Sequence, residues 1–185
     1  IPVGAETIVD MYPMDFEEWL WANGIASNIF DYLKKSLLDE TPIAASIHER
    51  LRQLLLEYIV VGGMPEAVKT FFATHDMNQV AQVQRHILNG YRDDMIKYAR
   101  AEDKPRIREC FESIPKQLAK ENKKFQYSVV RKGARSAQYI GSIQWLEDAG
   151  IAKRCYNTKV TELPLGGNAV LDCFKLYTTD IGMLV

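Results

Sequence analysis

The chain has 185 residues, of which 47% are hydrophobic and 25% are charged, so its composition is that of a globular protein with material for one or two cores. It contains no apolar run of the roughly eighteen residues that suggest a membrane span, and no basic stretch followed by an apolar signal core, so we expect a cytoplasmic protein. Cys110, Cys155 and Cys173 form no CxxC pair, which argues against a disulfide framework or a zinc knuckle, and we expect them to be reduced and buried.

The net charge of −1 conceals blocks of opposite sign. Residues 1–91 carry 6 Lys and Arg against 12 Asp and Glu, residues 92–135 carry 13 against 7, and residues 136–185 carry 4 against 5. A basic middle segment that leads into a candidate recognition helix is what contact with nucleic-acid phosphates requires. The alternative is that these residues form ordinary solvated helix surfaces.

The first predicted elements are a strand and a capped helix. Residues 5–12 alternate as in a strand. Asp15 and Glu18 form a capping-box pattern, which predicts a helix that begins after Asp15 and ends at Gly24. The residues expected to share its inward face are Phe16, Trp19 and Leu20.

Three further helices are delimited by residues that favour helix ends. One covers residues 27–38, and its expected inward side chains are Ile29, Tyr32, Leu33 and Leu37. A second capping box, Ser46 with Glu49, opens a helix that Gly62 and Gly63 end. Pro65 suits the first turn of the following helix, where its missing amide proton costs nothing.

A long helix, capped by Asp76 and Gln79, is predicted through about Arg100 and would bridge two halves of the chain. Its apolar stripe is Val80, Val83, Ile87, Tyr91, Met95 and Tyr98. We place the domain boundary in the charged connection 101–104. A helical domain then covers residues 1–103 and a second domain covers residues 104–185.

The second domain has the element order of a winged helix-turn-helix. A helix begins near Pro105 and is expected to break at Pro115, and residues 125–133 supply another helix. Ser136 as N-cap and Gly150 as C-terminal glycine bracket a helix in RSAQYIGSIQWLEDAGI, residues 135–151. Residues 151–160 and 173–184 are then predicted to pair as a hairpin. The predicted fold class is therefore mainly α, a helical bundle followed by a winged helix-turn-helix domain with a small β-hairpin.

The 135–151 helix is predicted to pack on one side and to remain free on the other. The predicted packed residues are Tyr139, Ile143, Leu146 and Ala149. The residues predicted for the other faces are Gln138, Ser142, Gln144, Glu147 and Asp148.

Motifs for nucleotide or metal binding are missing from the sequence. No Gly is followed by Lys, which excludes a GxxxxGK[ST] phosphate loop, and the zincin-like start at His48 and Glu49 has Arg52 where a second His is needed. Glu121 and Lys123 form an E-x-K triplet like that of some nucleases, but no strand precedes it, so chance explains it better. We predict no catalytic, cofactor-binding or metal-binding residues in this chain.

Three stretches together resemble one family. They are PVGAETIVDMYPMDFEEWL (residues 2–20), YIVVGGMPEAV (58–68), and QYIGSIQWLEDAGI (138–151) with FKLYTTDIGML (174–184). They are similar to bacterial and archaeal AAA-type ATPases in which the nucleotide domain is followed by a C-terminal domain of unknown function. We interpret Pro2 to Gly4 and Gly62 to Glu66 as fold signatures that serve turn geometry and helix docking.

The resemblance implies that the chain is a non-catalytic fragment of such an ATPase. The phosphate loop, with ATP and Mg²⁺, would belong to an ATPase core before Ile1, and a nuclease-like domain would follow Val185. Family members often have a basic residue after PVG, where this sequence has Ala5, so we do not expect this position to sense phosphate.

Two functions for the winged helix remain open. In the first, it binds double-stranded DNA, with Ser136, Gln138 and Gln144 offered to base edges. The predicted phosphate contacts are Arg131, Lys132 and Arg135 at the turn and Lys153, Arg154 and Lys159 on the ribbon. In the second, it is a protein-interaction module that docks on the ATPase core of the parent chain or on another subunit, including a second copy in a homo-oligomer. We expect no membrane partner.

Overall fold

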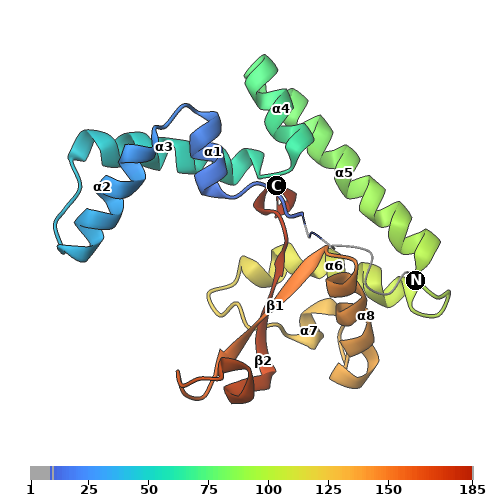
Figure 1. Cartoon of the computed structure of the whole chain (residues 1–185). Coiled ribbons are helices and arrows are strands. Elements are labelled where there is room, and N and C mark those ends of the chain that lie inside the picture. Colours follow the sequence, from blue (N-terminus) through green and yellow to red (C-terminus); the bar gives the residue numbers. More distant parts are fainter. Residues whose placement is uncertain (1–8, 10, 185) are drawn as a thin grey trace, which may run out of the picture. The chain divides into compact units, whose positions relative to one another are not determined.

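The structure, a computed structural model, describes residues 9 and 11–184. Within that part of the chain it contains eight α-helices and a two-stranded antiparallel sheet (Figure 1), which confirms the prediction of a mainly α protein with a small β-hairpin. None of the described helices is long and apolar enough to cross a membrane. The predicted strand 5–12 falls largely outside the described residues, as do Pro2 to Gly4 and Ala5, and Val9, Met11 and Tyr12 lie in no strand.

The described residues form two compact units. The first contains the chain up to Ala81 together with Asp180–Met183, and the second contains Gln82–Thr179 and Leu184. The domain boundary between residues 103 and 104 stays a prediction. The elements of the first unit are α1 (Phe16–Ala22), α2 (Ser27–Leu38), α3 (Ala45–Val61), α4 (Pro65–Thr74) and the start of α5 (Met77–Tyr98).

The capping box that begins α1 is confirmed. The Glu18 amide donates to Asp15 Oδ1 at 2.9 Å, and the Asp15 amide donates to Glu18 Oε2 at 2.9 Å. This start directs Trp19 inward, where it is fully buried. Its ring lies 5.4 Å from the Phe71 ring and 5.9 Å from the Tyr58 ring, measured between centroids, so α1 is the centre of an aromatic core.

Helix α2 has the predicted bounds, but its buried face is rotated from the predicted one. Leu37 is 79% exposed and Ser36 is buried. Ser36 lies three and four residues after Leu33 and Tyr32, so it continues the same helical face. Hydrophobicity alone favoured the neighbouring leucine, and that assignment was wrong.

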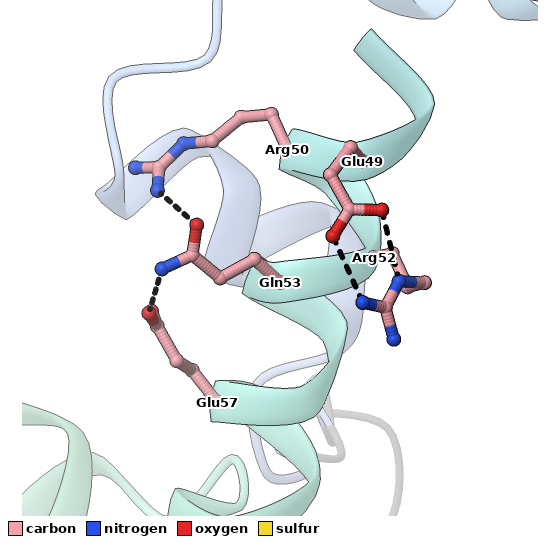
Figure 2. Close-up of polar contacts among 5 residues, drawn as sticks. All are labelled: Glu49, Arg50, Arg52, Gln53 and Glu57. Atoms are coloured by element: carbon pink, nitrogen blue, oxygen red, sulfur yellow. Dashed lines mark hydrogen bonds and ion pairs between the residues drawn. The ribbon is translucent and has the colours of Figure 1, made fainter. Parts of the chain in front are cut away.

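The predicted capping box of Ser46 and Glu49 is also wrong, because α3 begins one residue before Ser46. The amide of Ala44 at the helix start donates to the Tyr32 hydroxyl at 2.8 Å. Figure 2 shows that Glu49 instead pairs with Arg52, whose Nη2 donates to Glu49 Oε1 at 2.8 Å. A side chain from another helix therefore replaces the local cap.

The ends of α3 and α4 follow the predicted signals. Gly62 ends α3 with a φ of 77°, a conformation that favours glycine, and Pro65 stands in the first turn of α4. Asp76 caps the start of α5, since its Oδ1 accepts from the Asn78 amide at 2.8 Å. Far along α5, however, Tyr98 is 66% exposed and Ala99 is buried, because the buried stripe continues four residues after Met95 rather than three.

The second unit has the element order of a winged helix. Its elements after α5 are α6 (Lys104–Leu118), α7 (Tyr127–Val130), α8 (Ser136–Asp148), β1 (Ala152–Thr158) and β2 (Ala169–Thr178), with the short 3₁₀ helix η1 (Leu165–Asn168) between the strands. A second 3₁₀ helix, η2 (Ile181–Leu184), follows β2. In Figure 1 the two strands lie side by side as a long hairpin, and α6, α8 and both strands contribute to one hydrophobic core.

Helix α6 does not break at Pro115, contrary to the prediction. A proline here removes the hydrogen bond to the Phe111 carbonyl, at a cost of about 3 kcal/mol in a helix interior. Burial of Ile114 and Gln117 on either side of the exposed Pro115 opposes that cost. Gln117 also exchanges two hydrogen bonds with the Gln126 backbone, at 2.9 and 3.0 Å, and these bonds require the helix to continue.

The hairpin is confirmed, with different strand limits. Ala152 pairs with Thr178 and Tyr156 with Phe174, and the register then shifts so that Asn157 faces Val170. The second strand begins at Ala169 rather than at residue 173 and ends at Thr178 rather than at residue 184. Beyond the strand, the Thr179 amide still donates to the Ile151 carbonyl at 3.1 Å, and Asp180 belongs to the first unit.

Helix α8 ends as predicted but begins differently. Gly150 has a φ of 69°, as the C-terminal signal requires. The N-cap is Arg135, whose amide donates to Gln138 Oε1 at 3.1 Å, and Ser136 is the first helical residue, so its predicted capping role is wrong. Ser142 is buried and Ala149 is exposed, the reverse of the predicted faces.

Candidate functional site

The turn before α8 carries three of the predicted phosphate contacts. Arg131, Lys132 and Arg135 are all exposed, and Gly133 between them has a φ of 80°. The Arg131 guanidinium forms an ion pair with Glu109 of α6. The turn therefore presents cations at the start of the candidate recognition helix, and one of them is oriented by a carboxylate.

Glu109 also links α6 to α8. Its Oε2 accepts a hydrogen bond from the Tyr139 hydroxyl at 2.7 Å. Burial, followed by this hydrogen bond and by the negative charge of Glu109, raises the pKa of Tyr139. The hydroxyl therefore stays protonated and continues to donate at neutral pH.

The exposed surface of α8 is uncharged over most of its length. Ser136, Gln138 and Gln144 are exposed, as predicted for residues that could contact another molecule. Between them Ile140 is 53% exposed. At the end of the helix the Gln144 amide nitrogen donates to Asp148 Oδ1 at 2.8 Å, so this end carries a carboxylate.

The predicted ribbon cations occupy two kinds of position. Lys153 and Lys159 are exposed. The Arg154 side chain is only 10% exposed, and its Nε donates to Glu147 Oε2 at 2.6 Å, while its backbone amide donates to Glu147 Oε1 at 2.8 Å. Arg154 also donates to the Gln144 side chain. The structure thus brings Gln144 and Arg154 together in a network that joins α8 to β1, and a role of either in nucleic-acid contact stays a prediction.

A cavity of about 360 Å³ lies between the α6–α7 loop and the hairpin. It is lined by Asn122, Lys124, Cys155, Tyr156, Asn157, Cys173, Phe174 and Lys175. Cys155 is exposed and Cys173 is partly exposed, so the expectation of buried cysteines is wrong for this pair and correct for Cys110. Burial raises the pKa of Cys110 to about 12, which keeps that thiol protonated and unreactive.

Sequence reasoning missed a buried carboxylate in the first unit. Asp180 is 3% exposed, and it accepts the Gly63 amide at 2.5 Å and the Gly182 amide at 2.9 Å. A Cβ atom on Gly62 would lie 2.3 Å from Asp180 Oδ1 and one on Gly63 would lie 2.0 Å from the Met14 carbonyl oxygen, so only glycine fits at either position. The sequence does contain a D-x-G pattern at Asp180, in TTDIG. The Gly63 amide that donates to Asp180, however, lies 117 residues earlier in the chain.

Burial is the largest influence on the Asp180 carboxyl and raises its pKa, and the two amide donors oppose part of that increase. We call Asp180 with Gly62, Gly63 and Gly182 the glycine cradle. It closes the first unit by joining the end of α3 to η2.

In the part of the chain that the structure describes, no three His, Cys, Asp or Glu side chains lie together as a candidate metal site. Glu121 and Lys123 are exposed and belong to the irregular segment after α6. No strand precedes them within the described residues.

A family model described as a domain of unknown function, DUF8612, matches residues 52–185. The chain belongs to this family. The DUF8612 region includes most of α3, the whole winged helix and all residues of the glycine cradle. The comparisons with curated proteins and with solved structures give no match.

Proposed function

We propose that this chain is the non-catalytic C-terminal part of an AAA-type ATPase and that its winged helix binds double-stranded nucleic acid. The observation that carries the nucleic-acid proposal is the charge of the second unit. Residues 82–179 hold 18 Lys and Arg against 11 Asp and Glu, a net charge of +7, in a chain whose total is −1. A basic domain with this element order suits a polyanion.

The position of the exposed cations supports the same proposal. Lys132 and Arg135 precede α8, the helix that a winged helix places in the major groove, and Lys153 and Lys159 lie on or next to β1 of the wing. Cations on both elements would contact phosphates on either side of a groove. The uncharged α8 surface between them would leave Ser136 and Gln138 to face base edges.

The test is a titration of labelled duplex DNA with the whole chain at several salt concentrations. We expect the logarithm of the affinity to fall linearly with the logarithm of salt concentration, by about 0.9 for each phosphate contacted. The K132Q/R135Q variant should weaken binding and reduce this slope by about 2. A matched control, K34Q/K35Q, removes two exposed lysines of α2 in the first unit and should change neither.

Two results would overturn the nucleic-acid proposal. One is an affinity below detection at low salt. The other is an equal loss of affinity in the K34Q/K35Q control, because binding would then depend on total charge and not on the winged helix. The ATPase parentage has a separate test, which is whether the parent reading frame encodes a phosphate loop upstream of Ile1.

The second candidate function is docking on the parent ATPase core or on another subunit. The observation that favours it is the surface of α8, where Ala137, Ile140 and Gly141 are exposed without a charge. Light scattering of the chain with and without a separately expressed core tests this function. Docking predicts a complex that the I140E substitution prevents, and a monomer that ignores the core contradicts docking.

A further inference from the structure

A second cavity in the winged-helix unit lies between α5 and the C-terminal end of α8. Its volume is about 350 Å³, which is at the lower end of the range for small-ligand pockets. Its lining residues are Tyr91, Asp94, Tyr98, Trp145, Asp148, Ala149 and Ile151. We call it the aromatic–acidic pocket.

The charged residues that line the pocket are all acidic. Three aromatic rings, from Tyr91, Tyr98 and Trp145, are combined with the carboxylates of Asp94 and Asp148, and no Lys or Arg is among the lining residues. The faces of aromatic rings attract cations, and indole does so most strongly. The end of α8 adds the partial negative charge of a helix C-terminus. All three features favour a cation.

Two contacts of the lining residues support this assignment. The Lys97 ammonium lies 4.9 Å from the centroid of the Tyr98 ring, so this ring face can take a cation, and a bound ligand would displace Lys97 from it. The Gln144 amide nitrogen donates to Asp148 Oδ1 at 2.8 Å, which fixes the orientation of that carboxylate. A carboxylate accepts several hydrogen bonds, so Asp148 retains acceptor capacity for a ligand.

We propose that the aromatic–acidic pocket binds an arginine or lysine side chain presented by a basic segment of a partner polypeptide. Both carboxylates are exposed, so a free monovalent cation would be screened by water and salt. A polypeptide adds contacts beside the charged group, and its backbone limits the freedom that binding removes. The pocket would repel nucleic-acid phosphates, so it is independent of the proposed nucleic-acid surface.

The experiment uses the whole chain and a blocked Gly-Arg-Gly peptide. Binding is followed by the NMR signal of the Trp145 indole N–H, which the Trp145→Phe substitution identifies. We expect a saturable shift of this signal and none of the Trp19 and Trp21 signals, which belong to the first unit. The same peptide with citrulline, which has nearly the shape of arginine without its charge, should leave the Trp145 signal unchanged.

Two variants make the assignment specific. D94N/D148N keeps the size of both side chains and removes their charge, and we expect it to weaken peptide affinity by at least about tenfold. The matched control is D93N, a neighbouring exposed aspartate of α5 that does not line the pocket, and its affinity should equal that of the parent chain. A urea unfolding midpoint equal to that of the parent chain shows that both variants are folded.

Three results would overturn the proposal. They are equal shifts with the arginine and citrulline peptides, unchanged affinity in D94N/D148N, and no shift of Trp145 at any soluble peptide concentration. A fourth arm uses argininamide, which carries the same charge without a chain. If argininamide bound with the same affinity as the peptide, the pocket would be assigned to a free organic cation, and the proposal of a polypeptide partner would be overturned.

Discussion

The two units of this chain differ in both charge and construction. The first unit has 5 Lys and Arg against 13 Asp and Glu, a net charge of −8, whereas the second has a net charge of +7. The first unit is centred on the Trp19 aromatic cluster and closed by the glycine cradle, and the second combines three helices after α5 with a hairpin around one continuous core. The charge division of the sequence therefore follows the division of the fold, and each unit can be tested by itself.

The largest expected effect is in the glycine cradle. Asp180→Ala should lower the free energy of unfolding of the first unit by about 2–6 kcal/mol, because two buried amides lose their acceptor and each costs about 1–3 kcal/mol. Urea unfolding followed by the indole signals of Trp19 and Trp21 measures this loss. The control is Asp172→Ala, an exposed aspartate of β2. Equal stability of the two variants would contradict a structural role for the cradle.

The free energy of unfolding of the first unit should also depend on pH. The pKa of Asp180 is raised in the folded unit, so the folded state binds the proton more tightly than the unfolded state does. This proton stabilises the folded unit fully below the unfolded pKa of about 3.9, and the stabilisation is lost as pH rises through the raised pKa. Over that range the free energy of unfolding should fall by at most about 1.4 kcal/mol per pH unit. Unfolding experiments across this range should show the decrease. Asp180→Asn should remove it, and an unchanged slope would exclude Asp180 as its source.

The smallest expected effect is in the winged-helix unit. Gly90 lies within α5, and a Cβ atom there would meet nothing within 4 Å, so Gly90→Ala should stabilise this unit by about 0.8–1 kcal/mol. Gly133 is equally open but has a φ of 80°, so Gly133→Ala should destabilise the unit by about 1–2 kcal/mol. The Trp145 signal in urea unfolding measures both changes. If both substitutions changed the stability in the same direction, the space around the new Cβ atom, and not the backbone conformation, would determine their effects.

The sequence alone predicted the features that depend on neighbouring residues. The capping box at Asp15, the end of α3 at Gly62, the position of Pro65 and the end of α8 at Gly150 each depend on a few local dihedral angles or hydrogen bonds. The periodic apolar residues of α8 also placed Tyr139, Ile143 and Leu146 correctly in the core. Local chemistry is sufficient for such features because no distant group competes for them.

Several of the features that sequence analysis missed depend on distant partners, although the N-cap of α8, Arg135 with Gln138, is local. The cap of α3 uses the Tyr32 hydroxyl, and the passage of α6 through Pro115 is supported by Gln117, whose partner is Gln126. In the candidate site, the exposure of Lys132 could be predicted from its basic turn. The contact of Arg154 with Glu147 could not be predicted, because it depends on how β1 packs against α8.

The glycine cradle has a consequence for the order in which the protein forms. Asp180 follows residues 82–179 of the second unit in the chain, yet it completes the first unit. A ribosome adds about 5–20 residues per second and releases the N-terminal part first, so α1 to α4 emerge while their closing carboxylate is not yet synthesised. The first unit therefore reaches its native hydrogen bonding only after the winged helix has been made.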